Sequence, residues 1–369
     1  MFRLYIAILF VALGACAPRA QLVFAPNVAA GNPVRSVFIG TTRVPQGAGY
    51  SSHRSIRPSY LRYDIAVPPL RLPGAIDVPR KATIDPQTQF VATGRTIYPD
   101  PGAFRRDLRL ALNRRAGADR EAVIYVHGFN NTFDEGVLRI TQLAEDFELP
   151  GVAVHYSWPS AGNPLGYAYD RDSLLISRDG LETLIRDVRA AGARRIILVA
   201  HSVGSMLIME TLRQLAIAEP GSAARIIDAV ILISPDLDVE LFRSQAARIG
   251  KLPQPFGIFV SQRDKVLSLS ARLTGQRNRL GNVQSIEELA DLDVTVVDVT
   301  EFSTGAGHFT AGSSAAVISI FGRAGALEAA FSRDSAGRTG LFPGTVLTVQ
   351  NATSIILSPV TALAGAAAQ

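Results

Sequence analysis

One serine of the sequence lies in a setting that is typical of a nucleophile. Ser202 belongs to the segment A-H-S-V-G at residues 200–204, which follows the apolar run Arg195–Val199 and opens a predicted helix over 203–218. A serine between a buried strand and a helix, with small residues two positions away on both sides, indicates the nucleophile elbow G-x-S-x-G, with alanine replacing the first glycine. The sequence therefore predicts that Ser202 attacks an acyl carbon. The alternative is a serine that only caps the helix.

A nucleophilic serine needs a histidine as general base and a carboxylate that orients this histidine. In α/β-hydrolases the acid follows the serine along the chain and the histidine comes last. His308, in a loop bounded by glycines, is the only histidine after Ser202 and is predicted to be the base. Asp264 follows the apolar run Phe256–Val260 and is predicted to be the acid, with three aspartates as competitors: Asp236, Asp238 and Asp298.

Backbone N–H groups near the serine can stabilise the negative oxygen of a tetrahedral intermediate. The apolar run Ala122–Val126 continues into His127, Gly128 and Phe129, and the loop after this strand supplies one such donor in α/β-hydrolases. We expect the N–H groups of Phe129 and Val203 to form the oxyanion hole. Gly128 would let the chain turn closely enough to approach the substrate carbonyl.

Other side chains near these loops are candidates for a substrate pocket. Tyr156 and Trp158 follow a further apolar run, where ligands bind in open α/β sheets, and they could form an aromatic wall of an acyl pocket. Core packing is the alternative that the sequence leaves open for both. His127, Gly128 and Asp236 complete the predicted pocket residues, and Asp236 could instead shape the rim or cap the next helix.

The elements that must position these residues alternate between apolar runs and helical segments. Continuous apolar runs, unlike alternating ones, are typical of parallel strands that are buried on both faces. Such runs are Ala122–Val126, Val152–His155, Arg195–Val199, Ala229–Ile233, Gly257–Val260 and Val294–Val299, with helices predicted over 134–147, 171–191, 203–218, 239–249 and 284–290. The pattern predicts an α/β-hydrolase fold, a mostly parallel sheet with helices on both faces.

The remaining segments give the domain organisation. Short extended segments between prolines, then a helix over 104–115, precede the first parallel strand. We therefore expect one α/β-hydrolase domain over 34–330, with N-terminal strands and a helix over 34–120 and a catalytic core over 121–312. The Ala-, Pro- and Gly-rich residues 16–33 are interpreted as a tether, and the Ala-rich residues 331–369 as a C-terminal extension outside the repeating pattern.

The N-terminus resembles a bacterial lipoprotein signal. Arg3 precedes an apolar stretch over 4–13 that is too short for a permanent membrane helix but fits a secretory signal over residues 1–15. The segment L-G-A-C at residues 13–16 matches a lipobox, so the single cysteine, Cys16, is predicted to be acylated. An ordinary cleaved signal is the alternative. Because Ala17 rather than aspartate follows the cysteine, the outer membrane, facing the periplasm, is the expected location.

Composition excludes several classes of function. The chain has 369 residues and a formal net charge of +5, but its basic residues are scattered, so nucleic acid is not an expected partner. With five histidines and one cysteine, neither a structural zinc site nor a disulfide framework is expected. The predicted chemistry needs no metal and no organic cofactor.

The motifs together resemble a bacterial α/β-hydrolase family catalogued as a domain of unknown function, DUF900. The resemblance rests on five stretches and an N-terminal strand around 38–43, and it covers about 34–312: V-H-G-F-N-N-T-F at 126–133, H-Y-S-W-P-S at 155–160, A-H-S-V-G at 200–204, S-P-D-L-D at 234–238 and S-Q-R-D-K-V-L-S-L-S at 261–270. It implies the same triad of Ser202, Asp264 and His308. The sequence departs from the family pattern at Val203 and Ser205, and residues 340–369 have no counterpart in it.

The function expected from the sequence is that of a serine hydrolase. It would cleave a carboxylic ester of a small or lipid-like acyl substrate through an acyl-enzyme on Ser202, while tethered to the bacterial envelope by lipid on Cys16. An acyltransferase or an amidase would use the same triad, and these remain alternatives. A non-catalytic envelope scaffold that retains the hydrolase fold is a further alternative.

Overall fold

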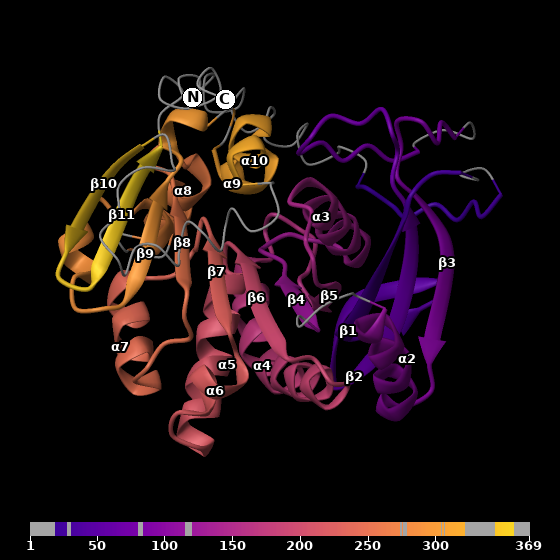
Figure 1. Ribbon diagram of the computed structural model, residues 1–369, viewed down its shortest axis with the longest axis horizontal. Coiled ribbons are helices and arrows are strands. Elements are labelled where there is room, and N and C mark those ends of the chain that lie inside the picture. Colours follow the sequence, from indigo (N-terminus) through magenta and orange to yellow (C-terminus); the bar gives the residue numbers. More distant parts are fainter. Residues whose placement is uncertain are drawn as a thin grey trace, which may run out of the picture.

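The chain folds around one large sheet with helices on both faces (Figure 1). The structure is a computed structural model, and it describes residues 19–27, 31–79, 84–114, 120–273, 275, 279–303, 305, 307–321 and 344–357. The predicted signal peptide and Cys16 lie outside the described residues. Among the described residues, no helix combines the length and the apolar character needed to cross a bilayer.

The sheet contains eleven strands in the order β10-β11-β9-β8-β7-β6-β4-β5-β1-β2-β3. Its parallel part includes β1 (Val34–Gln46), β4 (Glu121–Val126), β5 (Val152–Ser157), β6 (Arg195–His201), β7 (Ala229–Ile233), β8 (Phe256–Val260) and β9 (Val294–Asp298). Strands β2 (Gly49–Ala66) and β3 (Val91–Tyr98) extend one side in antiparallel pairing. The apolar runs of the sequence therefore become the central parallel strands, as expected for the α/β-hydrolase fold.

The helices begin and end where local sequence favours it. Helix α3 (Phe133–Asp146) has a complete capping box between Thr132 and Glu135. Helix α2 (Pro101–Asn113) starts with proline after the N-cap Asp100. The others are α4 (Tyr167–Ala190), α5 (Gly204–Ala218), α6 (Ser222–Ile226), α7 (Val239–Ile249), α8 (Lys265–Leu273), α9 (Thr310–Ser313) and α10 (Ala315–Phe321), with 3-10 turns η1 (Leu280–Asn282), η2 (Ile286–Leu289) and η3 (Thr300–Phe302).

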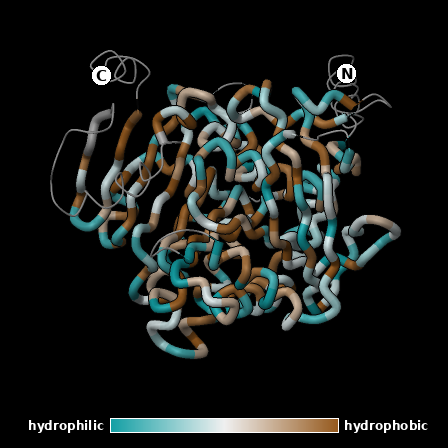
Figure 2. Tube along the Cα trace, turned by 45° about the vertical axis from the view of Figure 1, so that its right-hand side comes forward, coloured by the Kyte–Doolittle hydropathy of each residue, from teal (hydrophilic) through white to brown (hydrophobic). Residues whose placement is uncertain are grey.

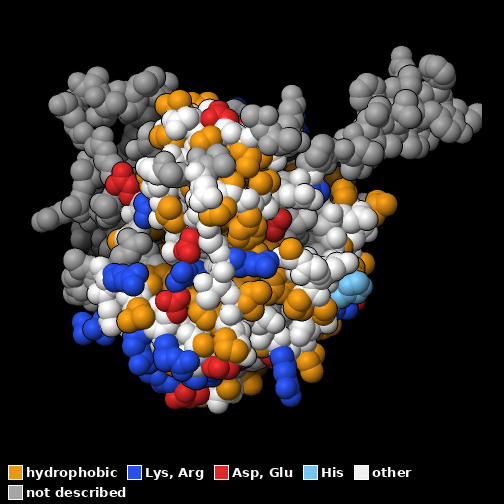
Figure 3. Space-filling model, turned by 90° about the vertical axis from the view of Figure 1, so that its right-hand side faces the viewer, with side chains coloured by type: hydrophobic (Ala, Val, Ile, Leu, Met, Phe, Trp, Pro, Cys, Tyr) orange, Lys and Arg blue, Asp and Glu red, His pale blue; other side chains and the backbone are white. Residues whose placement is uncertain are grey.

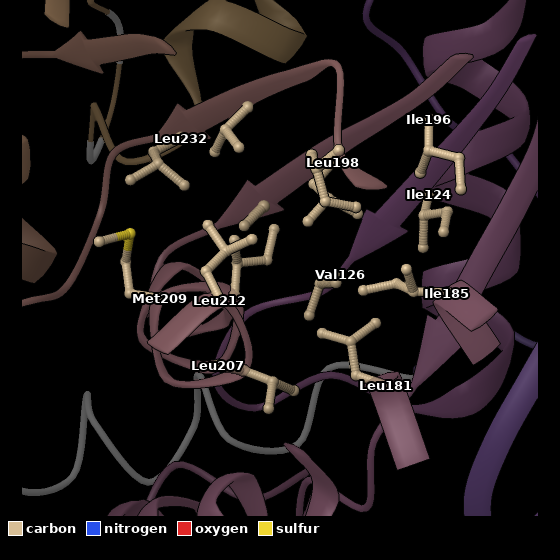
Figure 4. Close-up of a cluster of buried hydrophobic side chains, with 14 of the residues drawn as sticks. Ile124, Val126, Leu181, Ile185, Ile196, Leu198, Leu207, Met209, Leu212 and Leu232 are labelled. Carbon is tan, nitrogen blue, oxygen red and sulfur yellow. The ribbon is translucent and has the colours of Figure 1, made fainter. Parts of the chain in front are cut away.

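The largest core lies between the sheet and helices α4 and α5. Side chains of β4, β6 and β7 meet Leu181 and Ile185 of α4, and Leu207 and Leu212 of α5 (Figure 4). All of these side chains are buried, and the hydrophobic parts of the trace concentrate in the central strands (Figure 2). This packing fixes the position at which β6 ends and α5 begins.

Basic side chains do not form a continuous surface on the side shown in Figure 3. Lys and Arg are interspersed there with hydrophobic and acidic side chains and gather mainly toward the lower part of the view (Figure 3). This side includes α2, whose Arg106 and Arg109 are exposed, as is Arg114 directly after the helix. Mixed charge of this kind gives no continuous track for a phosphate backbone.

Three segments differ from the expectations. The residues interpreted as a tether are partly packed, since Ala25 N–H donates to Ala92 O and Ala92 N–H donates to Val23 O, both at 2.9 Å. Within the C-terminal extension, β10 (Gly344–Val349) and β11 (Ala352–Leu357) form a hairpin, and β11 pairs in parallel with β9. The hairpin covers the backbone groups that an open edge of β9 would expose. The helix predicted over 284–290 is only the 3-10 turn η2.

Candidate active site

Ser202 occupies a strained turn between β6 and α5. Its φ of 54° lies in the left-handed region, which is uncommon for a residue other than glycine and is often held at functional sites. The turn is fixed because Ser202 N–H donates to Ile233 O at 3.0 Å. A Cβ at Gly204 would lie 2.6 Å from His127 O, so this position needs glycine. The geometry is that of a nucleophile elbow.

His308 and Asp264 are joined by a hydrogen bond. The distance from His308 Nδ1 to Asp264 Oδ2 is 2.8 Å. The other carboxylate oxygen accepts from the N–H groups of Val266 at 3.0 Å and Leu267 at 2.9 Å, so the buried carboxylate is held in one orientation. Since Nδ1 must donate to this carboxylate, Nε2 of the neutral ring is left as the acceptor that a general base needs.

Glycine allows the histidine loop to pack against the acid loop. Gly307 has a φ of 71°, and a Cβ there would lie 2.8 Å from Arg263 O. Position 307, directly before His308, therefore requires glycine. This close approach brings the end of β9 to the end of β8, where Asp264 lies.

The residue before the serine, His201, contacts His308. The His201 and His308 rings have centroids 4.7 Å apart, and His201 Nε2 lies 3.2 Å from His308 O. On the other side, a Cβ at Gly128 would lie 2.9 Å from both Ser202 Cβ and His201 Nδ1. Within the described part of the chain, the Ser202 hydroxyl and the His308 ring do not share a hydrogen bond, and such bonds are often formed only when substrate is bound.

Burial keeps the His201 ring neutral. It lowers the pKa of His201 well below the ordinary value, and the nearby His308 lowers it further. A neutral His201 with a proton on Nε2 can donate to the His308 carbonyl. It does not compete with His308 for the serine proton.

Two backbone N–H groups are free to serve as an oxyanion hole. Over the residues that the structure describes, neither the N–H of Phe129 nor that of Val203 donates a hydrogen bond. Phe129 follows β4, and Val203 is the residue that precedes helix α5. The helix N-terminus adds a favourable field for negative charge at this point. The expected donors thus lie beside the serine.

The other candidate acids have different partners. Asp236 forms a buried ion pair with Arg279, with Nε and Oδ1 3.1 Å apart, and it also accepts from Ser270 Oγ. Asp238 caps α7 by accepting from Leu241 N–H at 3.0 Å. The remaining competitor, Asp298, accepts from Thr300 N–H at 2.8 Å. Of the four aspartates, Asp264 is the one bonded to His308.

Three predicted pocket residues belong to the core instead. Trp158 stacks on His127 with ring centroids 4.8 Å apart, and its Nε1–H donates to His127 O at 2.8 Å. Tyr156 OH donates to Ser177 O at 2.6 Å. All three side chains are fully buried, and burial lowers the pKa of His127 well below its ordinary value. The role of pocket wall is therefore wrong for Tyr156 and Trp158, because their polar atoms are satisfied inside the fold.

Sequence reasoning missed two contacts around the site. The first is the contact of the His201 ring with His308 O, because spacing cannot show that a ring contacts a carbonyl from another loop. The second is Arg19, whose guanidinium donates to Asn130 Oδ1 at 3.0 Å and to Asn130 O at 2.5 Å, beside the oxyanion loop. A flexible tether was expected there. Asn130 also has a φ of 54°, which constrains the backbone of this loop and which no sequence motif predicted.

The geometry can be compared with known proteins. The chain matches the model of a family described as α/β-hydrolases of unknown function (DUF900) over residues 102–323, more than half of its length. The chain belongs to this family. The α/β-hydrolase fold and the membership of a hydrolase family predicted from the sequence are thereby confirmed. No curated protein matches the sequence significantly.

Several solved esterase and lipase structures are similar to this DUF900 member. Lipase B of Aspergillus fumigatus is 15% identical, with 38% of this chain and 37% of the lipase covered and a TM-score of 0.28. An esterase of Pyrococcus furiosus is 11% identical, with 76% of this chain and 86% of the esterase covered and a TM-score of 0.33. A fungal esterase of Rhizomucor miehei is 11% identical, with 79% of this chain and 86% of the esterase covered and a TM-score of 0.31. The chain spans little more than a third of the length of the Aspergillus lipase.

The described residues contain no group of three or more His, Cys, Asp or Glu side chains placed to hold a metal ion. The polar side chains at the site are instead those of a hydroxyl nucleophile, an imidazole and a carboxylate. This set supports nucleophilic and general acid–base chemistry by the protein's own groups.

Proposed function

We propose that this α/β-hydrolase cleaves a carboxylic ester through an acyl-enzyme on Ser202. The observation that carries the proposal is the 2.8 Å bond between His308 Nδ1 and Asp264 Oδ2, on a loop whose His308 contacts the residue next to Ser202. A carboxylate behind the histidine and a serine on an elbow form the arrangement that acyl transfer needs.

In the proposed mechanism, His308 Nε2 takes the proton of the Ser202 hydroxyl as Oγ attacks the ester carbonyl carbon. The N–H groups of Phe129 and Val203 hold the resulting oxyanion. The intermediate then collapses, the alcohol leaves with the proton from His308, and the acyl group stays on Oγ. His308 then takes a proton from water as the water oxygen attacks the acyl carbon. When this second tetrahedral intermediate collapses, His308 returns the proton to Ser202 Oγ and the carboxylic acid is released. Asp264 stabilises the imidazolium in both halves.

The location is proposed separately from the chemistry. We propose that the chain is exported by the signal over 1–15, acylated on Cys16 and tethered to the bacterial envelope, at the outer membrane facing the periplasm. Support comes from the lipobox pattern at 13–16. Mass spectrometry of the N-terminus of the protein isolated from membranes tests this, because acylation adds a defined mass to Cys16 and an ordinary cleaved signal adds none.

The test of the chemistry is labelling with a fluorophosphonate, which reacts with activated serines. We expect the wild type to be labelled, and labelling to be lost in Ser202→Ala. A matched control is Ser205→Ala, three residues further along on helix α5, which should still be labelled. A folded wild type that is not labelled would contradict the proposal and favour the scaffold. Rates with p-nitrophenyl esters of increasing chain length would then define the acyl pocket.

A further inference from the structure

The N-terminal segment reaches the catalytic edge of the sheet before the chain enters β1. Arg19 contacts Asn130 in the oxyanion loop and Glu135 Oε2 at 2.5 Å. Leu22 N–H donates to Asp134 Oδ2 at 3.0 Å, at the start of α3. The first described residue of the chain is thus held by three contacts beside the oxyanion loop, close to the predicted nucleophile.

This contact limits the distance between the membrane anchor and the active site. Only two residues, Ala17 and Pro18, lie between Cys16 and Arg19, and the three steps from Cys16 to Arg19 span at most about 11 Å when fully extended. With the lipid on Cys16, as proposed above, the carboxyl edge of the sheet therefore lies near the bilayer. The edge at which α6 lies is on the far side of the molecule (Figure 1).

The carboxyl edge also exposes apolar side chains. Leu165, in the loop between β5 and α4, is 93% exposed, and Leu269 of α8 is 56% exposed. The two segments are in contact, because Tyr167 OH lies 3.2 Å from Ser270 Oγ. Single exposed leucines are ordinary on protein surfaces. Here they lie on adjoining segments around the site, at the edge where the anchor enters.

Positive charge lies beside Leu269. A hollow of about 470 Å³ lies beside the Asp264 loop, and Leu269 is part of its lining. Three cations also line it, Arg263, Lys265 and Arg272, while Asp264 is its only acid among the described residues and is bonded to His308. Arg263 is paired with Glu301 at 3.3 Å. Lys265 and Arg272 therefore remain to attract an anionic headgroup, each contributing about 1 kcal/mol near a charged bilayer.

We infer that the carboxyl edge of the sheet, with α8 and the loop around Leu165, is the surface by which the protein lies on an anionic phospholipid bilayer. Leucine side chains insert at the boundary between headgroups and acyl chains, and Lys265 and Arg272 contact the phosphates. This inference rests on the proposed ester hydrolysis and adds the side from which the substrate reaches the site. A site that faces the lipid would take its acyl substrate from the membrane plane.

The experiment reads the orientation of the full chain on vesicles. In the Cys16→Ser background, one cysteine is introduced by Leu165→Cys, Leu269→Cys or, as the matched control, Ile217→Cys, and labelled with an environment-sensitive fluorophore. Ile217 is 46% exposed and lies at the end of α5, away from the carboxyl edge. Vesicles of phosphatidylglycerol with phosphatidylcholine are added, and both the emission maximum and quenching by a lipid-attached quencher are measured.

We expect a blue shift and quenching at positions 165 and 269 and neither at 217. Lys265→Glu with Arg272→Glu should weaken the vesicle binding measured at position 269 about tenfold or more. Arg248→Glu with Lys251→Glu, at the C-terminal end of α7 and away from the carboxyl edge, should leave this binding unchanged. Equal responses at all three positions, or no response at 165 and 269, would overturn the inference. Adding Ser202→Ala must leave the shifts unchanged, so a failure of docking and a failure of catalysis are told apart.

Discussion

Two groups of polar residues lie at the carboxyl ends of neighbouring strands, and they differ in the hydrogen-bond partners of their polar atoms. At the ends of β6, β8 and β9, the chain brings together Ser202, Asp264 and His308. At the ends of β4 and β5, it places His127 and Trp158. In the second group, Trp158 Nε1–H donates to His127 O, and His127 Nε2 lies 3.0 Å from Trp158 O, so these ring nitrogens are already engaged with buried backbone oxygens. In the first group, Nε2 of His308 stays available for a substrate, and so do the nearby backbone N–H groups of Val203, after β6, and of Phe129, after β4.

Chemistry at the carboxyl edge of the sheet therefore depends on which polar atoms have no hydrogen-bond partner within the described part of the protein. Both groups consist of polar side chains that follow parallel strands. Changing residues in the first group should therefore alter activity without altering stability, and changing residues in the second group should do the opposite.

The largest expected effect is that of Asp264→Asn. An amide cannot hold His308 in the required tautomer or stabilise the imidazolium, so kcat for a p-nitrophenyl ester should fall about 10⁴-fold. Asp236→Asn is the matched control. It removes the carboxylate partner of the buried Arg279 and should lower the free energy of unfolding by about 3 kcal/mol. Activity per folded molecule should stay within a few-fold of wild type. The reverse pattern would make Asp236 the acid.

The second prediction concerns the buried group and is measured by urea unfolding. Trp158→Phe leaves His127 O without its donor and creates a small cavity, so stability should fall by about 2 kcal/mol. The kcat/KM of the folded fraction should be nearly unchanged. A loss of kcat/KM of more than tenfold, with stability unaltered, would return Trp158 to the substrate pocket.

A smaller effect is expected at the boundary between the two groups. His201→Phe keeps a ring between Gly128 and Phe309 but removes the donor to His308 O. We expect kcat to fall about tenfold, corresponding to one hydrogen bond of about 1.4 kcal/mol, with little change in KM. His201→Gln retains a donor and should recover part of kcat. Equal losses in both variants would mean that the ring matters only for packing.

The smallest expected effect is on how the stability depends on pH, and it comes from the buried His155. Burial lowers the pKa of His155 to about 3, whereas in the unfolded chain it is about 6.5. Below pH 6.5 the unfolded chain binds more protons than the folded one, so stability falls as pH falls, by up to about 1.4 kcal/mol per pH unit for this residue. His155→Asn should reduce this slope between pH 6 and 5.

The sequence predicted the central sheet well because buried parallel strands need continuous apolar runs, and such runs are visible without a structure. The bond of Asp264 to His308 follows the predicted pairing, since strand order places the ends of β8 and β9 side by side. The core position of Trp158 could not be predicted, because a ring after a strand can turn toward solvent or toward the core. The pairing of β11 with β9 joins residues far apart in the chain, Ala352 with Val294, and the composition of a segment does not show which distant strand it will pair with.

The central claim is that Ser202 and His308 act as one unit, and a double-mutant cycle tests it most directly. Steady-state ester hydrolysis is measured for Ser202→Ala, His308→Ala and the double variant, with folding checked by circular dichroism. We predict that all three show the same low residual rate, because removing either member disables the other. Losses that multiply in the double variant, or a His308→Ala variant as active as wild type, would contradict the account.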